Sequence, residues 1–239
     1  MTNFSNPSAG AARLYPGAAT LRVLGALLGY PDTRLRGYLP EMTALLTEDN
    51  VLSATRRGEI EALARWLAES ESLEAETTYV ETFDRGRATS LHLFEHVHGD
   101  SRDRGPAMID LAQTYERAGL YLAPGELPDY LPVVLEFVST QPPREAKAFL
   151  GEIAHLANAI FGALLQRGSR YASVMGALLD MAGEKARPVE LAPEPALDES
   201  WVEPPAFDGC STQGQARPGD PRPIRIVRKA GAPSQGATS

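Results

Sequence analysis

Apolar residues recur at helical spacing through most of this sequence, and that periodicity limits the folds open to it. One stripe at positions i, i+3, i+4 and i+7, which lie on one side of an α-helix, consists of Ile60, Leu63, Ala64 and Leu67. No segment shows a convincing alternation of apolar and polar residues, the pattern of a half-buried strand. The periodicity therefore predicts an all-α protein.

We expect about eight helices, joined by short polar loops and packed into a single bundle. Pro106 suits the first turn of one helix, because a first turn leaves its amide hydrogens unbonded. Gly119 suits the position just after the end of that helix, because glycine tolerates a left-handed backbone. That helix carries the stripe Met108, Leu111, Ala112 and Tyr115, and the other apolar stripes begin at Leu21, Tyr79, Leu131, Phe149 and Val174.

The composition changes at about Arg187. Residues 187–239 hold nine prolines and five glycines with little apolar periodicity, so they cannot bury enough apolar surface to offset the entropy lost on ordering. We therefore expect a flexible N-terminus at 1–17, a helical domain at 18–186 and a disordered tail at 187–239. The tail residues able to dock as a short linear element are Trp201, Val202 and Phe207.

The charge and the cysteine content exclude several classes of protein. The net charge is 23 − 31 = −8, whereas a binder of nucleic acid or of an anionic membrane needs a concentrated basic face. The lone Cys210 makes no internal disulfide and rules out a cysteine-based zinc cluster. The first residues lack the features of a signal peptide, and no apolar stretch approaches the roughly 18 residues that span a bilayer. We expect a cytoplasmic protein without stable membrane insertion.

Residues 90–105, SLHLFEHVHGDSRDRG, contain three of the four histidines in the chain. His92, Glu95 and His96 spell H-x-x-E-H, the ligand pattern of one class of zinc peptidases. On a helix spanning 90–98 these three side chains would share a polar side. The opposite, apolar side of that helix would carry Leu91, Leu93, Phe94 and Val97.

Three interpretations of this polar side remain open at the level of sequence. A catalytic zinc would use His92 and His96 as ligands and Glu95 as base, but nothing singles out the third protein ligand that such a site needs. The polar side can instead simply face solvent. It can also recognise a partner, because charged residues flank it on both ends, namely Asp84, Arg85, Arg87, Arg102, Asp103 and Arg104. Phosphate-binding loops and nucleophile-elbow motifs do not occur in the sequence.

Two runs in the sequence resemble a known family. They are YVETFDRGRATSLHLFEHVHGDSRDRGPAMIDLAQTYERAGL at 79–120 and ELPDYLPVVLEFVS at 126–139. Both are similar to the NarJ-type assembly chaperones of respiratory nitrate reductase, also called delta subunits. The resemblance covers about sixty residues at signature density, and the helical spacing over 20–182 is consistent with it.

The resemblance implies an all-helical protein that is not an enzyme and needs no cofactor. Such a chaperone would bind the N-terminal segment of the apo catalytic (alpha) subunit of nitrate reductase. It would keep that subunit competent for insertion of the molybdenum cofactor, and would not remain in the finished enzyme. Proteins of molybdenum-cofactor biosynthesis are further candidate partners.

The wider group of molybdoenzyme chaperones carries an E-x-P-D-H motif that is associated with partner binding. Here the motif is Glu126-Leu127-Pro128-Asp129-Tyr130, with tyrosine in place of histidine. Tyrosine cannot be cationic near neutral pH, so a role that needs a protonated histidine is in doubt. Asp129 also precedes the helix that begins at Leu131, where a carboxylate caps a helix start favourably.

A groove that holds a helical peptide needs apolar walls and a polar rim. Glu126 and Asp129 could meet a basic residue of the peptide, while the apolar candidates could equally be ordinary core. The candidate partner-binding residues are Tyr79, Phe83, Asp84, Arg87, Leu91, His92, Phe94, Glu95, His96, His98, Arg102, Asp103, Arg104, Glu126, Pro128, Asp129 and Tyr130. The rival hypothesis is a zinc-dependent hydrolase that uses His92, Glu95 and His96.

Truncation of the chain at Arg187 should leave the helical domain folded, because the tail lacks the apolar periodicity of a core segment. Thermal unfolding of the truncated and full-length proteins would measure this. A large fall in Tm on truncation would contradict the domain boundary.

Overall fold

The computed structural model describes residues 15–99 and 101–187, and within these ranges the protein is all-α, as predicted. The described residues form ten α-helices and one short 3-10 helix, and the extended backbone there includes one isolated bridge, between His92 and Tyr130. The expected tail from residue 188 onward, with Trp201, Val202 and Phe207, lies outside the described part.

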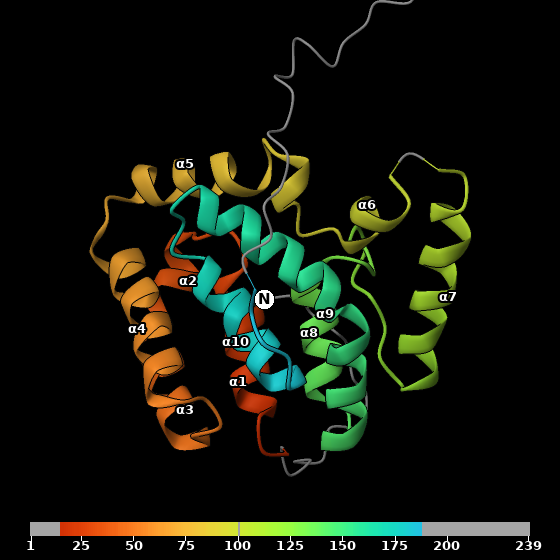
Figure 1. Cartoon of the computed structure of the whole chain (residues 1–239), viewed down its shortest axis with the longest axis horizontal. Helices are drawn as coiled ribbons and strands as arrows, with labels where there is room; N and C mark the ends of the chain where they lie inside the picture. Colours follow the sequence, from red (N-terminus) through yellow and green to blue (C-terminus); the bar gives the residue numbers. More distant parts are fainter. Residues whose placement is uncertain (1–14, 100, 188–239) are drawn as a thin grey trace, which may run out of the picture. The chain divides into compact units, whose positions relative to one another are not determined.

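In chain order the elements are α1 (Ala18–Leu27), α2 (Thr33–Gly37), α3 (Leu39–Asp49), α4 (Ala54–Glu69), α5 (Ser72–Phe83), η1 (Arg87–Thr89), α6 (Leu93–Val97), α7 (Arg104–Arg117), α8 (Leu131–Ser139), α9 (Pro143–Gln166) and α10 (Ala172–Ala182) (Figure 1). The apolar periodicity did not predict α2 and α3, whereas α6 lies inside the longer helix expected over 90–98. Helix α2 has five residues and a single large apolar side chain, so it shows no apolar stripe.

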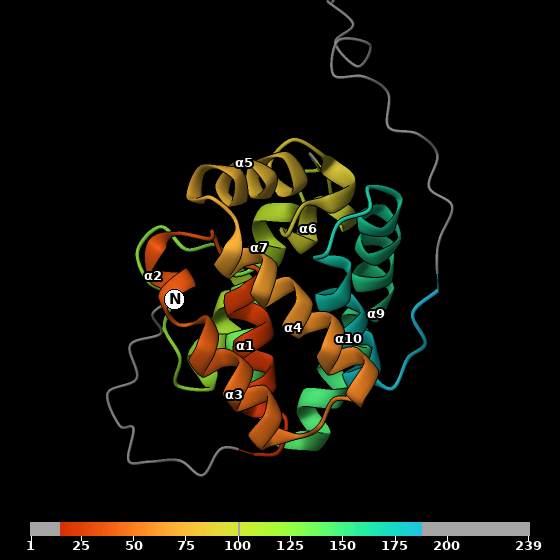
Figure 2. The same cartoon turned by 90° about the vertical axis from the view of Figure 1, so that its left-hand side faces the viewer.

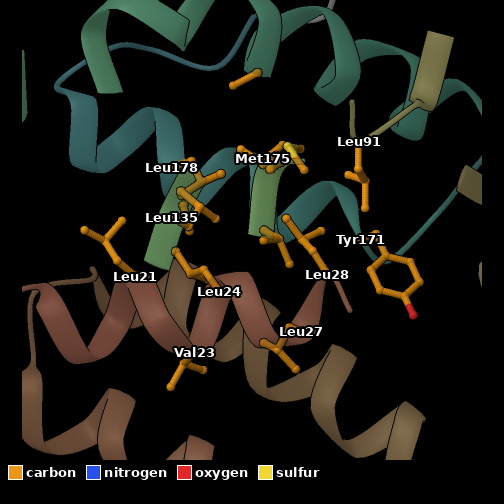
Figure 3. Close-up of a cluster of buried hydrophobic side chains, with 14 of the residues drawn as sticks. Leu21, Val23, Leu24, Leu27, Leu28, Leu91, Leu135, Tyr171, Met175 and Leu178 are labelled. Carbon is orange, nitrogen blue, oxygen red and sulfur yellow. The ribbon is translucent and has the colours of Figure 1, made fainter. Parts of the chain in front are cut away.

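Helix α1 lies in the core and packs against α3, α8 and α10. Its apolar side chains point in several directions: Figure 3 shows Leu24 facing Leu135 of α8 and Leu178 of α10, while Val23 points to the opposite side. The backbones of α1 and α8 approach closely at Gly25, where an added Cβ would lie 3.3 Å from the carbonyl oxygen of Pro132. A side chain at that position would push the two helices apart.

Helices α9 and α10 run side by side and supply much of the remaining core (Figure 2). Helix α9 has 24 residues and an 18-residue window of mean hydropathy 1.5, so it is long and apolar enough to span a membrane. The expectation that no apolar stretch approaches that length was therefore wrong. In the fold, α9 buries Leu150, Ile160 and Leu164. A helix in the core of a water-soluble domain also passes this test of length and mean hydropathy.

The start of α1 is fixed by a residue from the far end of α3. Gly17 precedes α1 with a left-handed backbone (φ 90°) and offers no side chain to cap it. The carboxylate of Asp49 does so instead, accepting hydrogen bonds from the Gly17 amide at 2.9 Å and the Thr20 amide at 3.0 Å. The Thr20 hydroxyl donates a third, at 2.7 Å. A long-range cap thus joins α3 to α1.

Asp49→Ala should lower the free energy of unfolding by about 1–2 kcal/mol, because it leaves two amides at the start of α1 without an acceptor. Urea unfolding of the variant and the parent would measure the difference. Glu48→Ala is the matched control, since Glu48 is the exposed neighbouring carboxylate. Equal losses in the two variants would contradict the capping role.

Candidate functional site

Two segments far apart in the sequence meet at His92 and Tyr130, which form an antiparallel bridge. The Leu93 amide donates to the Asp129 carbonyl at 3.0 Å, and the Leu131 amide donates to the Leu91 carbonyl at 2.9 Å. His92 therefore has an extended backbone, with φ −87° and ψ 103°. The helix expected over 90–98 was wrong at its start, because pairing with 129–131 keeps 91 and 92 out of it.

Asp129 is fully buried beside this bridge, and both of its carboxylate oxygens have partners. One oxygen accepts a hydrogen bond from the Phe94 amide at 3.2 Å, and the other lies 3.3 Å from His92 Nδ1. The expectation that Asp129 caps the helix beginning at Leu131 was wrong, since that helix has no side-chain cap. Asp129 instead caps α6, because its carboxylate accepts the amide of Phe94, which lies 35 residues earlier in the sequence.

Opposite charges surround the Asp129 carboxylate. The hydrogen bond to Asp129 raises the pKa of His92 above its usual range, although partial burial of the imidazole opposes this. The guanidinium of Arg104 lies 3.8 Å from Asp129 and 3.6 Å from Glu95. Four titratable or charged side chains thus converge where α6, the start of α7 and residue 129 meet.

A pair of tyrosines continues this cluster into the core. The Tyr79 hydroxyl donates to the Leu28 carbonyl at 2.9 Å, so the Tyr130 hydroxyl, 3.2 Å away, donates to Tyr79. Burial raises the pKa of both hydroxyls, so both stay protonated near neutral pH. The Tyr130 ring also packs against the His92 ring, with centroids 5.3 Å apart. Tyrosine therefore supplies at residue 130 a ring contact and a neutral donor.

The geometry required for zinc binding is not present at the H-x-x-E-H sequence. His92 turns to Asp129, Glu95 pairs with Arg104, and His96 Nε2 donates to the Ser90 carbonyl at 2.8 Å. The three side chains do not share one side of a helix. Within residues 15–99 and 101–187, no group of three or more histidine, cysteine or acidic residues is placed to hold a metal ion. The described residues therefore do not place His92, Glu95 and His96 in the arrangement that the zinc interpretation requires.

The remaining candidate residues divide by burial. Tyr79, Phe83 and Leu91 are core residues with at most 5% exposure, so they do not line an open groove. The rings of Phe94 and His98 pack edge to face, 5.4 Å apart, and both residues are half-buried. Glu126 is half-buried and Pro128 is buried. The exposed candidates are Asp84, Arg87, Arg102 and Asp103.

Helix α7 buries less of its apolar side than the longer helices of the bundle do. Tyr115 is its one buried residue, whereas Ile109 is 59% exposed, and the other large apolar positions, Met108 and Leu111, are half-buried. Figure 1 shows α7 at the edge of the fold with α6 above it. We call the described residues from α6 to the end of α7 (93–99 and 101–117) the α6–α7 arm.

Sequence reasoning missed the role of Tyr115, which was treated as one member of an apolar stripe. Its hydroxyl donates to the Pro128 carbonyl at 2.8 Å, and its ring packs on Phe137 of α8 with centroids 4.6 Å apart. Tyr115 therefore ties the end of α7 to the segment that contains Asp129. No sequence signal marks this contact, because a buried tyrosine in a helical stripe looks like any other core residue.

Comparison with known proteins identifies related chains. Residues 49–175 match the family model described as nitrate reductase delta subunit. The nitrate reductase molybdenum cofactor assembly chaperone NarJ of Escherichia coli K12 is 39% identical over 197 residues, which cover 82% of this chain and 84% of that protein. The probable chaperone of the same name from Bacillus subtilis 168 is 32% identical over 163 residues, covering 67% and 86%.

A solved structure shares the fold. The crystal structure described as that of a putative redox enzyme maturation protein from Archaeoglobus fulgidus aligns with a TM-score of 0.53, over 74% of this chain and all of that one. Its sequence is 17% identical, so the similarity concerns the fold alone.

The contact between His92 and Asp129 should make stability depend on pH. The folded-state pKa of His92 is raised, so its contribution is complete below the unfolded value of about 6.5 and is lost as pH rises through the folded value. Urea unfolding of the parent and His92→Gln should therefore differ more at pH 5.5 than at pH 9. A difference that is constant, or larger at pH 9, would contradict this.

Proposed function

Because the chain belongs to the nitrate reductase delta subunit family, we propose that it is a system-specific assembly chaperone for respiratory nitrate reductase. The observation that carries the proposal is the 39% identity to the E. coli chaperone over 84% of that protein. The similarity extends over 197 residues, much more than a single motif. The relatives from E. coli and B. subtilis are both named assembly chaperones, so the proposed function is binding and not catalysis.

The proposed partner is the apo catalytic subunit of nitrate reductase, recognised through its N-terminal segment. Binding would keep the subunit open for insertion of the molybdenum cofactor, and release would follow assembly. The chaperone would act in the cytoplasm before the complex reaches its membrane site, with proteins of molybdenum-cofactor biosynthesis as further partners. The net charge of −8 favours association with a basic segment.

The α6–α7 arm is the proposed binding surface. An amphipathic peptide helix binds by laying its apolar side against apolar residues of the receptor. Helix α7 offers such residues, because Met108 and Leu111 remain half-buried and Ile109 is largely exposed. The rim carries the exposed charges of Arg102 and Asp103, which can set the orientation of the bound segment.

Titration calorimetry of the full-length protein with a peptide copying the N-terminus of the cognate catalytic subunit tests the function. We expect saturable binding with one peptide per chain. The apo catalytic subunit itself provides a second ligand for the same titration. If the folded protein binds neither the peptide nor the apo-subunit, the proposed function is wrong.

Ile109→Asp should weaken that binding by about tenfold or more, since burying an apolar side chain of this size contributes about 1.5–3 kcal/mol. The residue is 59% exposed, so the fold should tolerate the change. Leu73→Asp is the matched control on α5, because Leu73 is 76% exposed and lies outside the arm. Equal affinities of the two variants would remove the arm from the binding surface.

A further inference from the structure

We infer that Asp129 is a positioning residue for partner binding: it holds the α6–α7 arm against the helical bundle and does not itself contact the partner. This inference rests on the proposed function and assigns a role to the aspartate of the Glu126–Tyr130 motif. The sequence left two roles open for this motif, direct contact of Glu126 and Asp129 with the partner and capping of the following helix.

The burial of Asp129 argues against direct contact. Its exposure is 0%, and its neighbour Pro128 is also buried. Its two carboxylate oxygens are directed at the Phe94 amide and the His92 imidazole, at 3.2 and 3.3 Å. A partner could reach this carboxylate only after those contacts had broken. Glu126, which is half-buried, is the motif carboxylate that solvent and a partner can reach.

Asp129 contacts the α6–α7 arm and His92, the residue directly before it. The carboxylate meets the backbone at the start of α6, at Phe94, and the guanidinium at the start of α7, 3.8 Å away on Arg104. Its carbonyl accepts the Leu93 amide at 3.0 Å. One residue therefore fixes the first turns of both arm helices relative to α8, which begins two residues later at Leu131.

The arm has little apolar packing to replace these contacts. Tyr115 is the one buried residue of α7, and Leu93 is the one buried residue of α6. Local stability follows the amount of buried surface and protected hydrogen bonding, so an arm with two buried side chains depends on its polar anchors. Loss of the Asp129 charge would loosen the arm while the core around α1, α9 and α10 stayed intact.

The test combines hydrogen exchange with peptide titration on the full-length protein. Asp129→Asn keeps the size of the side chain and removes its charge. We expect amide exchange in the α6–α7 arm to accelerate by about tenfold or more, with exchange in α1 and α10 unchanged, and peptide affinity to fall by a similar factor. Trimethylamine N-oxide, which favours compact states, should restore affinity in the variant because the binding surface itself is intact.

Two further variants separate positioning from contact. Arg104→Gln removes a half-buried partner of Asp129 that lies in the arm. It should accelerate amide exchange in the arm and lower peptide affinity, each less than Asp129→Asn does. This variant replaces Asp129→Asn if the latter fails to fold. Glu126→Gln removes the neighbouring accessible carboxylate and should leave exchange in the arm unchanged. If Glu126→Gln accelerated amide exchange in the arm as much as Asp129→Asn does, the specific role of Asp129 would be overturned.

The other combinations of exchange and affinity results also support or reject the positioning role of Asp129. Weaker binding by Asp129→Asn with unchanged exchange and no rescue by the osmolyte would mean direct contact. Faster exchange with unchanged affinity would mean that the position of the arm is irrelevant to binding. Absence of binding by the parent protein would instead reject the proposed function, and the exchange data would then show by themselves whether Asp129 holds the arm.

Discussion

A buried carboxylate must find hydrogen-bond donors or positive charge, because leaving it unpaired in the interior costs several kcal/mol. Asp129 satisfies this requirement with the Phe94 amide, the His92 imidazole and the nearby Arg104 guanidinium. To reach them, the segment before α8 pairs with the segment before α6. The carboxylate therefore joins the starts of α6 and α7 to the segment before α8, and Tyr115 adds a second tie at the other end of α7.

The stability of the fold is distributed unevenly as a consequence. Helices α1, α8, α9 and α10 bury most of their apolar side chains against one another, whereas α7 buries Tyr115. A binding protein benefits from such a division, because a rigid core can hold a weakly packed element whose apolar side is still available. The same division explains why the polar contacts at Asp129 matter more to the arm than they would to a core helix.

The sequence predicted the elements that repeat a pattern and missed those that depend on distant contacts. The stripe at Ile60–Leu67 and the long helix that carries Phe149 were expected, because a helix of three or more turns repeats its apolar positions. The helix assigned to 90–98 was wrong at its start because its first residues pair with the distant segment 129–131. Similarly, Asp129 looked like a cap for the nearer helix, and only the fold brings α6 to it. The family resemblance supplied the candidate residues without their geometry.

The central place of α1 has a consequence for how the chain folds during synthesis. Residues 18–27 leave the ribosome before two of their packing partners, α8 and α10, which lie at 131–139 and 172–182. Until those helices emerge, Leu24 and its apolar neighbours have no complete site in which to pack, and exposed apolar surface of this kind favours aggregation. A protein proposed to shield an immature subunit must itself pass through a nascent stage in which its innermost helix is uncovered.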